Sequence, residues 1–241
     1  MDSSAYAEAL RQAQGRPLCV EPLPRDFFEP SAAEVAPKLC GHWLLRRTPD
    51  GWSGGIIVET EAYLAHDPAC HGFKRETARN RAMYGPPGHA YVYFIYGNHW
   101  CFNAVCRPGG VAEAVLIRAI EPTFGLERMR ARRRAVEPKD LTNGPAKCCA
   151  ALDIDRAFDG VDLCDSASPI VLARNPTLGE LTRSLGPLVT TTRIGLTKAA
   201  DWPLRFCLAG SRFVSRGVVG LTAKRKERPS RHRRDDQGES P

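Results

Sequence analysis

The chain of 241 residues lacks several features that would place it in other classes of protein. It contains no run of eighteen apolar residues, which excludes a membrane-spanning helix. It has no C-x-x-C pair, although zinc sites usually draw on two separated ligand pairs. The H-x-E and P-C-x-x-C signatures of zinc deaminases and the phosphate-loop pattern G-x-x-x-x-G-K-[ST] are missing too. We therefore expect neither a zinc deaminase nor a P-loop enzyme.

Cysteine is present in an odd number, nine, in a long chain without a secretory signal. The first sixteen residues lack the basic-then-apolar order of a signal peptide. We expect reduced, mostly buried thiols and a cytoplasmic location.

The formal net charge is +7 and the isoelectric point about 9.0, which favours a polyanionic partner. Residues 223–241 hold seven of the Lys and Arg residues and four of the Asp and Glu residues. Two further basic clusters lie at Lys74–Arg81 and Arg128–Arg134. We interpret the second as a solvated helix face. The first lies between two candidate active-site segments, so we expect it to contact phosphate.

The pattern of apolar residues and turns predicts one mixed domain. Ser31 to Glu34 forms an S-x-x-E capping box, which predicts a helix ending near Gly41. Residues 64–87 form a long polar connection. Helices are expected over Phe124–Ala135 and from Ala146. Strands are expected over His42–Arg47, Gly55–Tyr63, Ala90–Tyr96, Trp100–Cys106, Glu113–Ile120, Ile170–Leu172, Thr192–Leu196 and Leu204–Leu208.

The expected fold class is α+β, with a curved antiparallel β-sheet core, a protruding β-hairpin and peripheral helices. Residues 1–22 are expected to be a weakly ordered segment, residues 23–222 the domain, and residues 223–241 a basic, disordered tail.

A strand that ends at Tyr63 carries the first candidate catalytic residue. Its period of two places Glu59, Glu61 and Tyr63 on one face. A glutamate on a strand usually faces solvent, and Glu59 competes with Glu61 for a catalytic role. Tyr63 and an arginine on an expected neighbouring strand, Arg118, favour Glu61. A general base must reach its proton directly or through one water, and an arginine would keep it ionised.

Tyrosines gather on the hairpin that follows. The segment from Tyr91 to Asn103 reads as two strands joined at Gly97-Asn98. Tyrosine is a good strand former, so cross-strand packing is the alternative role, and it suits Tyr91. Strict alternation places Tyr96 opposite Tyr91 and Tyr93, beside the turn. A carboxylate, an aromatic pocket and a projecting aromatic suit an enzyme that takes a base out of DNA.

Two alternatives stay open on the residues alone. His66, Cys70 and His71 would be the ligands of a metal site, which is the weaker interpretation. A non-catalytic nucleic-acid-binding module would stack bases on the same tyrosines and hold phosphates with the arginines. Such a module has little use for Glu61, because a carboxylate repels phosphate.

Several motifs in a fixed order give the chain a resemblance to a known family. From Phe27 to Ser215 it resembles the mammalian-type alkyladenine (3-methylpurine) DNA glycosylases, which also occur in bacteria. The motifs are Ala36-Pro37, Glu59–Tyr63, His71-Gly72, Thr77–Met83, Tyr91–Gly97, Asn103, Leu116–Pro122, Asn143–Pro145 and Pro203–Phe206.

The resemblance implies a role for each matching residue. Glu61 would activate water for attack on the sugar C1′, and Arg118 would help to position that water. Tyr96 would fill the hole left by the extruded nucleotide. The flipped base would be held by Tyr63, His71, Tyr93 and Asn103, the last of which disfavours the 2-amino group of guanine.

The resemblance also implies the reaction and its partners. We expect a base-excision-repair hydrolase without metal or cofactor that acts on double-stranded DNA containing damaged purines. No lysine lies beside Glu61 in the sequence, so we expect a monofunctional glycosylase without lyase activity. It would act as a monomer in the bacterial cytoplasm, associated with the nucleoid through DNA. The connection between Tyr63 and His71 is shorter than the mammalian one, and the tip Gly97–Trp100 differs from it.

Overall fold

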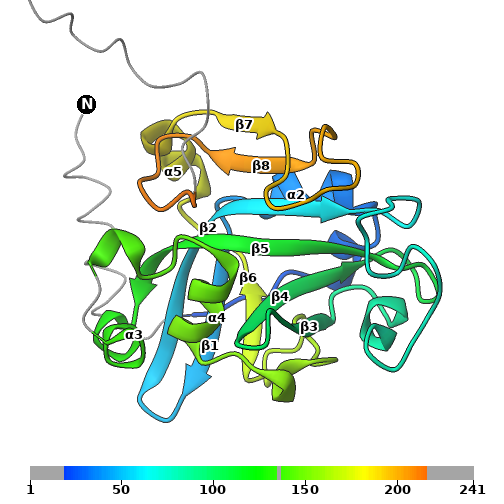
Figure 1. Cartoon of the computed structure of the whole chain (residues 1–241). Helices are drawn as coiled ribbons and strands as arrows, with labels where there is room; N and C mark the ends of the chain where they lie inside the picture. Colours follow the sequence, from blue (N-terminus) through cyan, green and yellow to red (C-terminus); the bar gives the residue numbers. More distant parts are fainter. Residues whose placement is uncertain (1–18, 135–136, 216–241) are drawn as a thin grey trace, which may run out of the picture.

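A curved antiparallel sheet of eight strands forms the centre of the computed structural model, which describes residues 19–134 and 137–215 (Figure 1). The strand order is β3-β4-β5-β2-β1-β6, and β8 pairs with both β2 and β7. The strands are β1 (Trp43–Thr48), β2 (Gly51–Tyr63), β3 (Ala90–Ile95), β4 (His99–Cys106), β5 (Glu113–Phe124), β6 (Ile170–Ala173), β7 (Leu188–Thr191) and β8 (Arg205–Leu208). The expected α+β class with a hairpin, here β3–β4, is confirmed.

Four α-helices of the described residues lie around this sheet: α2 (Ala32–Leu39), α3 (Leu126–Arg133), α4 (Pro145–Leu152) and α5 (Leu178–Leu185). Figure 1 shows α2 behind the sheet and α4 in front of it. The predicted capping box opens α2, where the backbone N–H of Ser31 donates to the Glu34 carboxylate at 3.4 Å. Short 3₁₀ turns occupy Arg25–Phe28, Arg81–Tyr84, Pro138–Asp140 and Arg156–Phe158.

Strand β2 has neighbours on both sides over much of its length. Its first half pairs with β1 and its second half with β8, while β5 runs along the other side. The apolar run Ile56–Val58 is fully buried, as expected for a strand covered on both faces. The register between β2 and β5 shifts on both sides of Glu59, which marks a β-bulge. Glu59 and Glu61 are thereby held in the interior, close to β5 and β8.

Two predicted elements differ from the structure, and one helix was not predicted. The segment Thr192–Leu196 is a loop after β7. Its polar groups bond outside a strand ladder: the Arg193 side chain donates to the Ala62 carbonyl and to Asp67, and the Ile194 N–H donates to the Glu61 carboxylate. Strand β5 continues to Phe124, and Gly125, with a φ of 69°, separates it from α3. Helix α5 was missed, because Gly179 and nearby prolines resemble turn signals.

All nine cysteines lie in the described part of the chain and are free, and seven of them are buried. Glu21 accepts a backbone hydrogen bond from Arg174, and Pro22 bridges to Ala173. The rest of the predicted N-terminal segment, residues 1–18, and the tail, residues 223–241, fall outside the described residues. Within the described residues, no helix is long and apolar enough to cross a membrane.

Candidate active site

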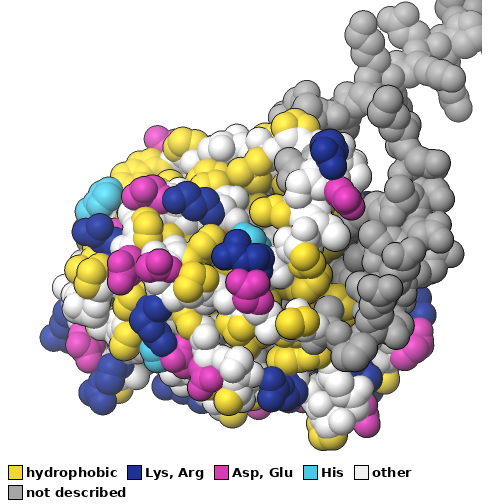
Figure 2. Space-filling view, turned by 180° about the vertical axis from the view of Figure 1, so that it is seen from behind, with side chains coloured by type: hydrophobic (Ala, Val, Ile, Leu, Met, Phe, Trp, Pro, Cys, Tyr) yellow, Lys and Arg dark blue, Asp and Glu magenta, His cyan; other side chains and the backbone are white. Residues whose placement is uncertain are grey.

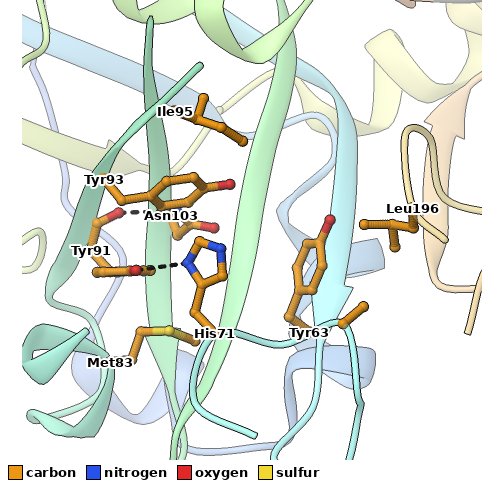
Figure 3. Close-up of a pocket in the computed structure, with 9 residues that line it drawn as sticks. Tyr63, His71, Met83, Tyr91, Tyr93, Ile95, Asn103 and Leu196 are labelled. Atoms are coloured by element: carbon orange, nitrogen blue, oxygen red, sulfur yellow. Dashed lines mark hydrogen bonds between the residues drawn. The ribbon is translucent and has the colours of Figure 1, made fainter. Parts of the chain in front are cut away.

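An aromatic pocket opens where β2 ends beside the β3–β4 hairpin (Figure 3). Figure 3 shows the Tyr63 ring on one side of it and the His71 and Tyr93 rings on the other. Its lining residues are Tyr63, Ala69, His71, Met83, Tyr91, Tyr93, Ile95, Asn103 and Leu196. A hollow between aromatic rings, with a few polar groups, is suited to a flat heterocycle such as a purine.

The wall formed by His71 is fixed by two tyrosines of β3. Nδ1 of His71 lies 2.8 Å from the Tyr91 hydroxyl, and the His71 and Tyr93 ring centroids are 4.4 Å apart. Burial, with help from the positive charge of Arg79, holds the pKa of His71 below its usual value. The lowered pKa favours an uncharged His71 imidazole at neutral pH.

Asn103 forms part of the same hairpin wall. It is the Cα partner of Tyr91 across β3 and β4, and its Nδ2 donates to the Tyr91 carbonyl at 3.0 Å. Its side chain is buried and lines the pocket. Tyr91, which the sequence assigned to packing, thus fixes both His71 and Asn103.

Glu61 borders the pocket through Tyr63. The Tyr63 hydroxyl donates to Oε2 of Glu61 at 2.8 Å. Oε1 accepts the backbone N–H of Ile194 at 2.8 Å and lies 3.1 Å from Nη1 of Arg118. Glu61 and Arg118 do not themselves line the pocket, and the Glu61 side chain is wholly buried. Three donors therefore converge on one carboxyl group.

Glu59, the competing carboxylate, is paired with two arginines in a buried ion cluster. Its Oε1 accepts from Nε of Arg118 and from Nε of Arg205, each at 2.8 Å. Ser215 adds its backbone N–H at 2.6 Å and its hydroxyl at 2.8 Å. Burial alone would raise the pKa of Glu59, but Arg118, Arg205 and Ser215 outweigh it and leave that pKa below its usual value. Arg118 therefore bridges the two carboxylates.

Tyr96 stands apart from the pocket, at the tip of the hairpin. The residue is 81% exposed, and its φ of 54° lies in the left-handed region that side chains disfavour. An exposed aromatic held in a strained conformation suits contact with a partner surface.

The basic cluster Lys74–Arg81 lines a second hollow beside the pocket. This hollow shares His71 and Tyr91 with the pocket, and Lys74, Arg75, Arg79 and Lys198 contribute to its wall. Seen from behind the view of Figure 1, the surface carries acidic and basic side chains interspersed (Figure 2).

The second basic cluster is only partly the solvated helix face that was expected. Arg128 donates to Ser53 and to the Trp52 carbonyl, and Arg132 donates to the Ala151 carbonyl. These two side chains attach α3 to the rest of the fold.

The candidate metal ligands have separate partners. The His66 ring lies 5.7 Å from the Trp202 ring, the Cys70 thiol donates to the Ala112 carbonyl, and His71 pairs with Tyr91. Within residues 19–134 and 137–215, no group of three His, Cys, Asp or Glu side chains is arranged to hold a metal ion.

Sequence reasoning missed several residues of the site. The face that Tyr91 shares with Tyr93 was a usable signal for its place in the pocket. Met83, Ile95 and Ala69 are ordinary apolar residues with no such signal. Ile194 and Leu196 come from the loop after β7, which only the fold brings to β2.

Comparisons with known proteins agree with the geometry. A family model described as methylpurine-DNA glycosylase (MPG) matches residues 26–212. A Rhodopseudomonas palustris protein named "Putative 3-methyladenine DNA glycosylase" is 52% identical over 194 residues, which cover 80% of this chain and 88% of that protein. Proteins of the same name from Methanoculleus marisnigri and Rhizobium meliloti are 47% and 50% identical, cover 80% and 79% of this chain, and match over 98% and 95% of their own lengths.

Proposed function

Because this chain belongs to the methylpurine-DNA glycosylase family, and so to the DNA glycosylases of base excision repair, we propose that it excises alkylated or deaminated purines from double-stranded DNA. It would hydrolyse the N-glycosidic bond and leave an abasic site. The observation that carries the proposal is the bond between Tyr63, a wall of the aromatic pocket, and Glu61, which Arg118 and Ile194 hold in place.

The flipped base would lie between Tyr63 on one side and His71 and Tyr93 on the other. An alkylated purine carries positive charge, and aromatic faces attract cations. Asn103 lies in the same wall and would disfavour the 2-amino group of guanine. Tyr96 would fill the gap that the extruded nucleotide leaves in the duplex, and damaged pairs cost less to open.

Glu61 would act as the general base and Arg118 would position the water. The water oxygen attacks C1′ of an oxocarbenium-like sugar while Glu61 takes the water proton. The electron pair of the glycosidic bond leaves with the base. Nη1 of Arg118 lies 3.1 Å from Oε1 of Glu61, so the arginine is close enough to help hold the water beside this carboxyl group.

A neutral lesion such as hypoxanthine also needs a proton on the leaving base. The pocket offers no ready donor, because burial holds the His71 pKa below its usual value and raises the pKa values of Tyr91 and Tyr93. We therefore expect slower release of hypoxanthine than of a cationic methylpurine.

No lysine is among the residues that line the pocket, which supports a monofunctional glycosylase without lyase activity. A lyase needs an amine that attacks the sugar and forms a covalent intermediate with it. A carboxylate that delivers water forms no such covalent intermediate. We further propose that the protein acts as a monomer, since one continuous duplex must cross the hairpin face. We also propose that it uses no metal or cofactor and that it acts in the bacterial cytoplasm, on nucleoid DNA.

The test uses three duplexes that carry 7-methylguanine, hypoxanthine or no damage. Free base should be released from the first two, and the strand should break only after alkali. Borohydride should trap no covalent complex. Strand breaks without alkali would contradict the monofunctional reaction. If neither damaged duplex released its base, the proposed glycosylase activity would be contradicted.

A further inference from the structure

Arg193 is a buried arginine that neither the pocket nor the water site uses directly. Its side chain has no exposed surface and forms an ion pair with Asp67, which is equally buried. Its guanidinium carbon lies 4.7 Å from the centre of the Tyr63 ring. A buried charge needs compensation, and a cation over an aromatic face is attracted to it.

The Arg193 guanidinium joins three segments of the site. Nη1 donates to the Ala62 carbonyl of β2 at 3.0 Å and to Asp67, which lies in the connection leading to His71. Nη2 donates to the Ala199 carbonyl of its own loop at 3.3 Å. The next residue, Ile194, supplies the N–H that holds Glu61. Arg193 therefore fixes the base stack and the water site relative to each other.

Arg193 lies over the Tyr63 ring from outside the pocket lining. Tyr63 lines the pocket, whereas Arg193 does not. Nε of Arg193 has no hydrogen-bond partner among the described residues, so part of the group is held by contact alone. The positive charge of Arg193 acts on the Tyr63 side chain. Burial and then Glu61 raise the pKa of the Tyr63 phenol, and Arg193 acts in the opposite direction.

We infer that Arg193 is a positioning residue that sets specificity: it stacks behind Tyr63 and reduces the preference of that ring for positively charged purines over neutral ones. A cation on one face draws π-electron density toward itself, so the other face attracts a second cation less strongly. A neutral purine stacks with little change. The arrangement would broaden the range of lesions that the pocket accepts. This inference rests on the proposed function.

The experiment compares equilibrium dissociation constants for two duplexes whose lesions resist hydrolysis through a 2′-fluoro sugar. One carries cationic 7-methylguanine and the other carries neutral hypoxanthine, at a pH on the acidic side of neutrality. In the double variant Arg193→Met with Asp67→Asn, which removes the cation together with the charge of its buried partner, the constant for the neutral lesion divided by that for the cationic lesion should rise about fivefold above wild type. In Arg193→Lys, which keeps the charge, the ratio should stay at the wild-type value.

Both constants in a ratio are measured with the same protein preparation. A smaller folded fraction therefore changes both constants by the same factor and leaves their ratio unaffected. A residue that only stabilised the fold would leave the ratio unchanged. An unchanged ratio in the double variant, or an equal rise in Arg193→Lys, would overturn the inference. Wild-type protein that bound neither lesion more tightly than undamaged duplex would overturn the proposed function instead.

Discussion

At the scale of single residues, the site depends on side chains that hold other side chains. Tyr91 bonds to His71 through its hydroxyl and to Asn103 through its carbonyl. Tyr63 bonds to Glu61, and Arg118 bridges Glu61 and Glu59. A base entering the pocket would therefore meet rings whose positions are already fixed, which lowers the entropy lost on binding.

Tyr91→Phe should weaken lesion binding by about fivefold while leaving the maximal rate of base release nearly unchanged. The loss of one buried hydrogen bond costs about 1 kcal/mol, and here it frees the His71 ring. The measurement is the enzyme concentration giving half-maximal single-turnover release.

Tyr84→Phe is the matched control. It removes an equivalent hydroxyl, which donates to the Gly72 carbonyl at 2.7 Å outside the pocket lining. Equal effects of the two substitutions would show that Tyr91 does not act through His71.

How far the sequence predicted the site depends on the kind of residue. Glu61, Tyr63 and Arg118 could be proposed because a carboxylate and an aromatic at alternating positions, with an arginine on another strand, carry a chemical signal, and the three side chains do meet. The bond from Ile194 to Glu61 was not found, because backbone donors carry no sequence signal. The Arg193–Asp67 pair was not found either, because it joins segments far apart in the chain.

At the scale of elements, the β3–β4 hairpin presents Tyr96 at its tip. Tyr96→Gly should relieve a left-handed backbone conformation that costs a tyrosine about 1 kcal/mol, so thermal stability should be equal or higher. Binding of a lesion duplex should nevertheless weaken, because glycine cannot fill the gap in the DNA. Melting curves and gel-shift titrations measure the two effects.

Tyr96→Phe is the control for that substitution, since it keeps the aromatic ring and should retain binding. Wild-type affinity in Tyr96→Gly would exclude a role of the tip in holding the extruded nucleotide.

Strand β2 is fastened to β5 and β8 through Glu59, which bonds to Arg118 and Arg205. The pKa of Glu59 lies below its usual value of 4.5, so its ionised form stabilises the fold above pH 4.5. That stability is lost as the pH falls through the lowered pKa. In Glu59→Gln, the free energy of unfolding near neutral pH should drop by about 3–5 kcal/mol, because the buried Arg118 and Arg205 each lose their ion pair with Glu59.

The same variant should show a flatter loss of stability below pH 4.5 than wild type. Urea unfolding at several pH values measures both effects. Parallel curves for the two proteins below pH 4.5 would contradict the role of Glu59.

The elements themselves were predicted best where local patterns are strong. The alternation before Tyr63, the turn at Gly97-Asn98 and the Ser31 capping box all correspond to observed elements. The segment Thr192–Leu196 has the residues of a strand, but the side chains of β2 and Asp67 satisfy its polar groups. Such tertiary competition is invisible in a short window of sequence.

At the scale of the whole molecule, one sheet holds the pocket, the buried carboxylates and the projecting tip together. Basic residues beside the pocket and the net charge of +7 favour DNA as the partner. Residues 223–241 add seven basic side chains outside the described part of the chain.

Removal of residues 223–241 should weaken binding to undamaged DNA and make it less dependent on salt. Each phosphate contact contributes about −0.9 to the slope of log affinity against log salt, so lost contacts make the slope shallower. The rate of base release at saturating enzyme should not change. Binding titrations at several salt concentrations measure the slope, and an unchanged slope would exclude a contribution of these residues.

The most direct test of the account is single-turnover base release from a 7-methylguanine duplex by wild type, Glu61→Gln and Glu59→Gln. We predict that Glu61→Gln loses about 10²- to 10⁴-fold in rate while it still binds the lesion, and that folded Glu59→Gln loses much less. Release by Glu61→Gln at the wild-type rate would contradict Glu61 as the general base. Lesion binding by wild type without any release would instead indicate a non-catalytic nucleic-acid-binding module.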